Sequence, residues 1–167
     1  LEKKFFQSKL YRLQKKNQNL YMKCTAVEEK QKGGEKMKVI KVTGAIIQNK
    51  NKFLICRRGP NEKASGFWEF PGGKLEWNET LEDCMLRELK EELCIDGVLH
   101  SLYDNYSFKT KEVTYDLYFF RIKKYHGKLT KTVHDAIKWV ELRDFDNYSF
   151  LPGDEPLITK LKKDDNI

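Results

Sequence analysis

The 167-residue sequence has no long hydrophobic run, no low-complexity tract and no cysteine motif. No segment approaches the roughly 20 apolar residues that a membrane-spanning helix needs. The charged N-terminus also lacks the apolar core of a secretory signal peptide. The four cysteines are widely spaced without a C-x-x-C pair, which excludes the usual zinc and disulfide frameworks; they are Cys24, Cys56, Cys84 and Cys94. We therefore expect a cytoplasmic protein with no membrane partner.

What remains is a polar chain with enough apolar residues for one domain. Hydrophobic residues make up 40% of the sequence and charged residues 34%, and one domain typically has about 100–200 residues. The formal net charge of +7 is concentrated at one end. Residues 1–36 hold ten Lys or Arg and four Glu, which leaves 22 basic and 21 acidic groups for residues 37–167. Because that larger part is nearly neutral, its bulk charge does not support nucleic-acid binding.

Residues 1–36 are therefore interpreted as a basic N-terminal extension, and residues 37–167 as the folded domain. Apolar side chains at Phe6, Leu10 and Leu13 have weak helical spacing. This spacing allows a basic amphipathic helix that lies on a membrane surface or against an acidic partner. The high polarity of the extension favours instead a segment without packed structure.

A third interpretation concerns the start of the chain. The segment KGGEKM, residues 32–37, can be encoded by AAAGGAGGNGAAAARATG. That nucleotide sequence contains a bacterial ribosome-binding sequence just ahead of a start codon. On this hypothesis Met37 is the native initiator, and residues 1–36 are upstream sequence that does not belong to the native protein.

The larger part of the chain has the hydrophobic pattern of a mixed α and β domain. Runs rich in β-branched and aromatic residues alternate with helical patterns and a glycine-rich turn. The QNKN segment between the first two runs is a hairpin signal. We expect strands at 38–47, 52–58, 98–108, 113–122 and 136–142, a glycine loop near 71–73, and helices at 81–93 and 155–163.

The segment 81–93 has the features of an amphipathic helix with a defined start. Thr80 can cap its N-terminus, with Asp83 three residues later as a variant of the capping box. Leucine or methionine recurs every four residues from Leu81 to Leu93. This spacing predicts an apolar stripe that faces the core.

The same helix carries three glutamates close together, Glu88, Glu91 and Glu92. At 100° per residue they fall within an arc of about 100° beside the apolar stripe. Like charges at this spacing repel, so the cluster is either an ordinary solvated face or a site that holds a cation. Carboxylate oxygens suit hard divalent ions such as Mg²⁺ or Mn²⁺.

The loop ahead of the helix favours the cation site. From Gly73 onward the segment GKLEWNETLEDCMLRELKEELCI resembles the signature of the Nudix hydrolase family, G-x5-E-x7-R-E-U-x-E-E-x-G-U, in which U is a bulky apolar residue. Only the second glycine differs, since Cys94 stands there, and a left-handed Cys costs about 1 kcal/mol. The matching residues are Gly73, Glu79, Arg87, Glu88, Leu89, Glu91, Glu92 and Ile95.

The resemblance implies the Nudix fold, an α/β (α+β) domain in which a mixed β-sheet lies between helices and a loop–helix–loop forms the Nudix box. It also implies a Mg²⁺ cofactor, for which Mn²⁺ could substitute. Glu79 would reach Arg87 and hold the loop against the helix. Glu88 is preferred as the group that accepts a proton from the attacking water, with the neighbouring glutamates or water alone as alternatives. The implied catalytic residues are Glu79, Arg87, Glu88 and Glu91, and the implied metal ligands are Gly72, Glu88, Glu91 and Glu92.

The similarity covers most of residues 38–163 and includes segments outside the box that would bind the substrate. It points equally to MutT-type enzymes, which hydrolyse 8-oxo-dGTP, and to the CTP pyrophosphohydrolase branch. Arg58 and Lys63 would contact the nucleotide phosphates, and Phe70 would lie near the base. Asp154 stands where MutT-type enzymes use an asparagine to read the oxidised guanine. An ionised Asp only accepts hydrogen bonds, as from an exocyclic amine of cytosine or adenine, whereas a protonated Asp still donates one and so admits oxidised purines.

The implied reaction converts a nucleoside triphosphate and water into a monophosphate and pyrophosphate. Alternative functions are hydrolysis of another nucleoside diphosphate derivative or of an RNA 5′ end, and non-catalytic nucleotide binding that regulates a partner. Non-catalytic members usually lose carboxylates of the box, and this chain keeps all of them. Many members carry a further carboxylate just before the strand expected at 136–142. Here Val133 holds that place; Asp135 or His134 beside it could substitute for the carboxylate, or either could be an ordinary loop residue.

Overall fold

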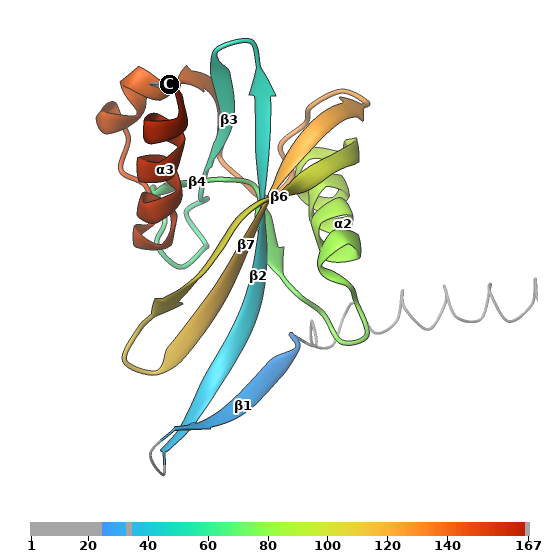
Figure 1. Cartoon of the computed structure of the whole chain (residues 1–167). Coiled ribbons are helices and arrows are strands. Elements are labelled where there is room, and N and C mark those ends of the chain that lie inside the picture. Colours follow the sequence, from blue (N-terminus) through green and yellow to red (C-terminus); the bar gives the residue numbers. More distant parts are fainter. Residues whose placement is uncertain (1–24, 33–34, 166–167) are drawn as a thin grey trace, which may run out of the picture.

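The computed structural model describes residues 25–32 and 35–165, so the amphipathic helix considered for the first 20 residues lies outside the described residues. The described part contains eight β-strands and two α-helices, α2 and α3 (Figure 1). None of the helices described is long and apolar enough to cross a membrane.

The strands form one mixed sheet with the central order β4-β3-β2-β7-β6. Strand β2 runs parallel to β7 and antiparallel to β1, β3 and β5, while β8 pairs with β3. This arrangement confirms the expected mixed sheet. The strands are β1 (Val27–Lys32), β2 (Glu35–Asn49), β3 (Lys52–Arg57), β4 (Trp68–Glu69), β5 (Gly72–Lys74), β6 (Asp96–Lys109), β7 (Val113–His126) and β8 (Ala136–Glu141).

All five predicted strands are present, at slightly different bounds. The expected hairpin closes between β2 and β3, where Asn49 pairs with Lys52 and Lys50 has a positive φ of 55°. Three strands were not predicted: β1, β4 and β5. The strands β4 and β5 have only two and three residues and lie in the segment expected to be a loop. Strand β1 pairs with the first part of β2, so the boundary expected at residue 37 falls inside β2.

Helix α2 (Leu81–Leu93) covers one face of the sheet, and its bounds agree with the prediction. The hydroxyl of Thr80 accepts a hydrogen bond from the backbone N–H of Asp83, which confirms the predicted cap. Met85, Leu89 and Leu93 are fully buried against apolar residues of β2, β3 and β7. The apolar stripe thus fixes which way the rest of the helix faces.

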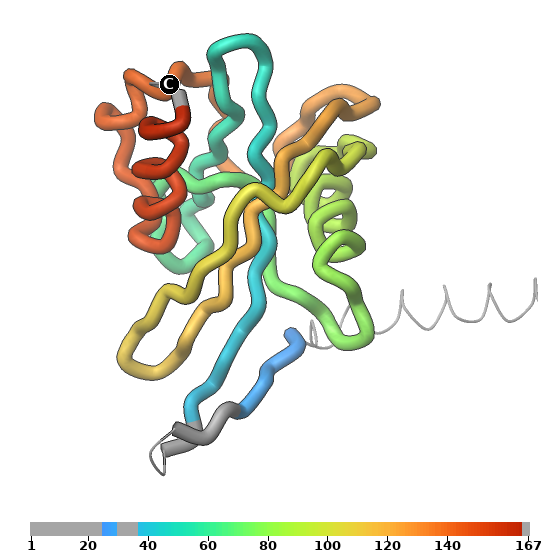
Figure 2. The backbone as a smooth tube through the Cα atoms, in the orientation of Figure 1, coloured from blue at the N-terminus to red at the C-terminus, as the bar shows by residue number. Residues whose placement is uncertain are grey.

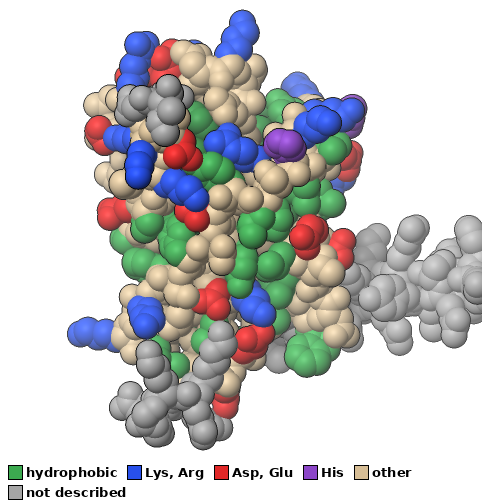
Figure 3. Space-filling view, viewed as in Figure 1, with side chains coloured by type: hydrophobic (Ala, Val, Ile, Leu, Met, Phe, Trp, Pro, Cys, Tyr) green, Lys and Arg blue, Asp and Glu red, His purple; other side chains and the backbone are tan. Residues whose placement is uncertain are grey.

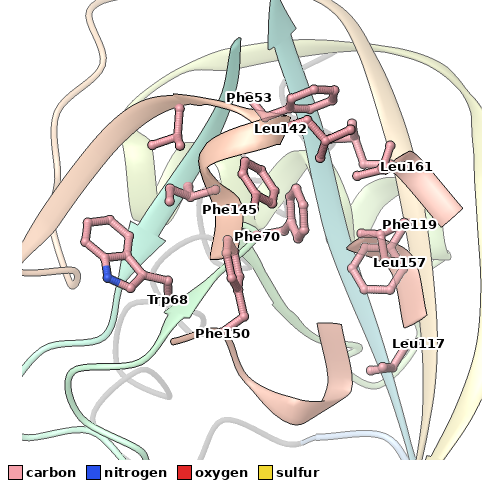
Figure 4. Close-up of a cluster of buried hydrophobic side chains, with 13 residues drawn as sticks. Phe53, Trp68, Phe70, Leu117, Phe119, Leu142, Phe145, Phe150, Leu157 and Leu161 are labelled. Carbon is pink, nitrogen blue, oxygen red and sulfur yellow. The ribbon is translucent and has the colours of Figure 1, made fainter. Parts of the chain in front are cut away.

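Helix α3 (Glu155–Asp165) covers the opposite face together with two 3₁₀ turns, Leu142–Asn147 and Pro152–Asp154. Figure 2 shows α2 and α3 on the two sides of the sheet. The core on the α3 side is aromatic: Phe70, Phe145 and Phe150 pack together there (Figure 4). The fold is therefore a sheet between helices, as expected.

Helix α2 ends at Cys94, which has φ 58° and ψ 27° in the left-handed region. The backbone N–H of Cys94 donates to the carbonyl of Lys90, and that of Ile95 donates to Leu89. The position therefore requires the conformation that glycine adopts without a steric penalty. Its side chain is exposed.

We predict that Cys94→Gly raises the free energy of unfolding by about 0.5–1 kcal/mol, because it removes the Cβ that makes this conformation costly. Urea unfolding followed by circular dichroism measures the change. Cys94→Ala is the matched control, since it removes the thiol and keeps the Cβ. Equal stability of the Gly and Ala variants would show that the left-handed backbone carries no cost here.

Candidate active site

Strand β5, with the loop that follows it, lies unusually close to β2 and to α2. A Cβ on Gly72 would lie 2.0 Å from the carbonyl oxygen of Thr43 in β2. A Cβ on Gly73 would lie 2.3 Å from Oε1 of Glu88 in α2. Both contacts are shorter than a side chain tolerates, so glycine at these positions lets the backbone approach β2 and leaves room for the Glu88 carboxylate.

The Arg87 side chain ties this loop to the helix. Its Nε donates to Glu79 Oε1 at 2.7 Å and one terminal nitrogen donates to Glu79 Oε2 at 3.0 Å, a two-point contact. The same terminal nitrogen donates to the carbonyl of Lys74 at 3.1 Å. The structure thus brings Glu79 and Arg87 together as the sequence predicted.

Arg87 also holds two of the three clustered glutamates. The second terminal nitrogen donates to Glu88 at 2.7 Å and to Glu91 at 3.3 Å. Burial lowers the pKa of Arg87, but hydrogen bonds and charges from Glu79 and Glu88 outweigh it and raise that pKa overall. For Glu79, burial raises the pKa, while the contacts from Arg87 and the Glu76 N–H hold it below its usual range.

The three glutamates have different surroundings. Glu88 is 6% exposed, and the Glu92 carboxylate accepts a hydrogen bond from the backbone N–H of Gly72 at 2.9 Å. Both line an acidic pocket of about 400 Å³ together with Thr25, Gly73, Lys74 and Glu76. The side chain of Glu91 is 47% exposed and is not among the residues that line this pocket. Two of the three expected carboxylates therefore share one pocket, and the third, Glu91, does not line it.

The acidic pocket has the chemistry of a divalent-cation site. Burial raises the pKa of Glu92 well above its usual value, and the nearby charges of Glu88 and Glu69 raise it further. A cation would relieve this repulsion and supply the charge that buried carboxylates need. Among the described residues no three His, Cys, Asp or Glu side chains already converge as a ligand set, because these carboxylates are held by Arg87 and by the Gly72 N–H. The donors present fit Mg²⁺ or Mn²⁺.

A second, larger cleft of about 440 Å³ adjoins the acidic pocket. Its walls are mostly apolar and come from β2, β4, β5, β6, β7, the segment that follows β3 and the turn at 151–154. Gly73 and Lys74 line both cavities, so the two meet at the β5 strand. The residues that line the cleft are Val42, Thr43, Gly44, Arg58, Lys63, Ala64, Glu69, Gly72, Gly73, Lys74, Phe108, Thr110, Tyr115, Leu117, Phe119, Leu151, Pro152, Gly153 and Asp154.

Three of the four residues predicted to bind substrate line this cleft: Arg58, Lys63 and Asp154. Arg58 donates to Glu69 at 2.6 Å and to the carbonyl of Lys63 at 2.7 Å. Its charge is therefore partly compensated by a carboxylate in the same wall. Glu69 was not singled out from the sequence, where only its place between two aromatic residues was visible.

Asp154 is buried in the wall of the cleft at 8% exposure. Burial raises its pKa to about 8, and the charge of Glu69 contributes to the increase. Its Oδ2 accepts a hydrogen bond from the backbone N–H of Phe70 at 3.2 Å. The raised pKa favours the protonated form of Asp154 near neutral pH, in which its carboxyl group can donate a hydrogen bond.

Phe70 differs from its expected position beside the base. Its ring is 4% exposed and packs against Phe119 and Phe150 in the aromatic core, as Figure 4 shows, and it is not among the residues that line the cleft. Its backbone N–H, which reaches Asp154, is its link to the cleft. Trp68 is also in the core, at 6% exposure.

The segment before β8 does not supply a carboxylate to the acidic pocket. Val133 is 49% exposed, Asp135 pairs with Arg57 at 2.7 Å, and His134 is buried beside Glu69 at 3.2 Å. None of the three is among the residues that line that pocket.

Comparisons with known proteins agree with this geometry. A family model described as the NUDIX domain matches residues 37–161. The chain is 31% identical over 122 residues to a CTP pyrophosphohydrolase of Escherichia coli, covering 73% of this chain and 90% of the relative. It is 33% identical over 130 residues to an 8-oxo-dGTP diphosphatase of the same organism, covering 76% and 99%. The solution structure of the E. coli ORF135 protein superposes with a TM-score of 0.69 at 30% identity, covering 76% of this chain and 91% of that one. The chain belongs to the Nudix hydrolase family.

Proposed function

We propose that the protein hydrolyses nucleoside triphosphates to nucleoside monophosphates and pyrophosphate, with Mg²⁺ as the cofactor. The observation that carries the proposal is the junction of the two cavities. An acidic pocket suited to a metal-bound polyphosphate opens at Gly73 and Lys74 into an apolar cleft suited to a nucleoside. Two E. coli relatives named for CTP and 8-oxo-dGTP support a triphosphate substrate.

Nudix hydrolases use divalent metal ions. We propose that Glu88, Glu91, Glu92 and the Gly72 carbonyl hold the ion, with Mn²⁺ able to replace Mg²⁺. A bound divalent ion neutralises phosphate charge and lowers the pKa of water. Arg87 and Glu79 keep the loop and the helix in register, and Glu88, which is nearly buried next to Gly73, is the proposed proton acceptor.

On the substrate side, we propose that Arg58 and Lys63 bind phosphate oxygens at the rim of the cleft and that Asp154 reads the base. A protonated Asp154 donates one hydrogen bond, which suits an acceptor on the base, including the oxygen of an oxidised purine. Once ionised, the Asp154 carboxylate only accepts hydrogen bonds, which suits an exocyclic amine of the base. Phe70 contributes by fixing Asp154 through its backbone N–H.

We also propose that residues 37–167 form the catalytic unit and that Met37 is the native initiator. The family match supports this boundary because it begins at residue 37. Mass spectrometry of the protein made from its own genomic locus tests the proposal. A mature chain that includes the β1 residues would contradict it.

The proposed reaction predicts that a nucleoside triphosphate releases pyrophosphate, and not orthophosphate, in the presence of Mg²⁺. The assay covers CTP, 8-oxo-dGTP, the ordinary nucleotides, nucleoside diphosphate sugars and a capped RNA. Excess EDTA should abolish turnover, and Mn²⁺ should restore it. Release of orthophosphate, or turnover that EDTA leaves unchanged, would contradict the proposal.

The raised pKa of Asp154 predicts a pH-dependent stability difference from Asp154→Asn. The folded wild type binds a proton that the unfolded chain releases above about pH 4. Its stability relative to the variant therefore falls by about 1.4 kcal/mol per pH unit between about pH 4 and pH 8. Urea unfolding of both proteins at pH 5 and pH 7.5 measures this difference. A constant difference across that interval would show that Asp154 is ionised in the folded protein.

A further inference from the structure

Three charged or polar side chains in and behind the cleft wall form a continuous network: Arg58, Glu69 and His134. Arg58 donates to Glu69 Oε2 at 2.6 Å, and His134 Nε2 lies 3.2 Å from Glu69 Oε1. Each oxygen of the carboxylate therefore has its own partner. Arg58 lies in the segment just after β3, and His134 in the segment just before β8.

Glu69 depends on these partners because it is only 9% exposed. A buried carboxylate is strongly destabilising unless donors surround it. It also lines the nucleoside cleft, and its charge contributes to the raised pKa of Asp154. A residue that fixes the orientation of Glu69 therefore also fixes part of the surface that would contact a bound nucleoside.

The environment of His134 defines its hydrogen-bonding role. Its side chain is 1% exposed, and its Nδ1 is the buried side-chain nitrogen or oxygen without a hydrogen-bond partner among the described residues. A proton on Nδ1 would be a buried, unpaired donor, which costs about 1–3 kcal/mol. The proton therefore belongs on Nε2, from which it points to Glu69.

The backbone on either side of His134 is anchored independently of Glu69. The N–H of Asp135 donates to the carbonyl of Arg57 at 3.0 Å, and the Asp135 carboxylate accepts from Arg57 Nε at 2.7 Å. The carbonyl of Val133 lies against Gly59, where a Cβ would come within 3.0 Å. These contacts hold the imidazole ring in a fixed place behind the cleft.

We propose that His134 is a positioning residue that donates its Nε2–H to Glu69 and fixes that carboxylate as an acceptor in the cleft wall. The group recognised by Glu69 is an N–H or O–H donor of the bound nucleoside, so this assignment rests on the proposed nucleotide hydrolysis. With a protonated Asp154 in the same cleft, the wall presents one acceptor and one donor. His134 thereby contributes to the choice of nucleoside without touching it.

Two substitutions separate positioning from simple packing. His134→Leu keeps the bulk of the side chain and removes the donor. His134→Gln replaces the imidazole N–H donor with an amide N–H donor at a similar distance from the backbone. Asp135→Asn is the control for disturbance of the same segment, since it weakens only the contact with Arg57 at the rim. Steady-state kinetics with each nucleotide that the wild type hydrolyses gives kcat and KM separately.

We expect His134→Leu to raise KM for the preferred nucleotide by about 10–100-fold, with kcat within about 3-fold of the wild type, because Glu69 is then no longer held in the orientation that accepts a hydrogen bond from the bound nucleoside. The His134→Leu variant should discriminate less strongly between nucleotides than the wild type does. His134→Gln and Asp135→Asn should remain within about 3-fold of the wild type. Equal effects of the Leu and Gln variants, or an unchanged KM in both, would overturn the assignment.

A second measurement tests the geometry without substrate. In protein labelled with ¹⁵N-histidine, the signals of His134 are those that His134→Gln removes from the set of three histidines. We expect the Nε2–H tautomer, and a clear shift of these signals in Glu69→Gln. The Nδ1–H tautomer, or signals unaffected by Glu69→Gln, would overturn the assignment. Absence of pyrophosphate release by the wild type would instead overturn the proposed function, which distinguishes the two failures.

Discussion

The site depends on the burial of several carboxylates close to one another. Glu88 and Glu92 share a pocket, and the charge of Glu69 in the neighbouring cleft acts on Glu92. Such crowding persists only where cationic or N–H donors compensate it. Arg87 supplies the compensation on one side through contacts with three glutamates, and Gly73 leaves the space in which the Glu88 carboxylate lies. The proposed cation would compensate the negative charge that remains in the pocket.

One short strand, β5, connects the acidic pocket with the larger cleft. Strand β5 pairs with the middle of β2 and continues directly into the loop that leads to α2. Its residues Gly73 and Lys74 line both cavities. A substrate that spans these cavities places its nucleoside against the apolar walls and its phosphates beside the carboxylates. On the face shown in Figure 3, basic and acidic side chains are interspersed.

The sequence predicted the features that depend on local periodicity or on a fixed motif. Helix α2, its cap at Thr80 and the contact between Glu79 and Arg87 all follow from residues close together in the chain. The position of Phe70 did not follow, because its burial depends on aromatic residues that are distant in sequence. The strands β1, β4 and β5 were missed because they are short or polar and gain stability from pairing with longer strands.

The contact between Glu69 and His134 could not be predicted from the sequence, for a related reason. They lie 65 positions apart, and neither belongs to a motif whose spacing reveals the contact. Only the pairing of β3 with both β4 and β8 brings their segments together. The raised pKa of Asp154 also required the structure, because it results from burial and from the charge of Glu69.

The central claim is that the buried carboxylates bind a divalent cation, and direct Mn²⁺ binding tests it most simply. Titration followed by the electron paramagnetic resonance signal of free Mn²⁺ compares the wild type with Glu92→Gln and with Glu82→Gln, an exposed control on the same helix. We expect the wild type and the control to bind alike, and Glu92→Gln to bind at least about 10-fold more weakly. Equal affinity in all three proteins would contradict the account.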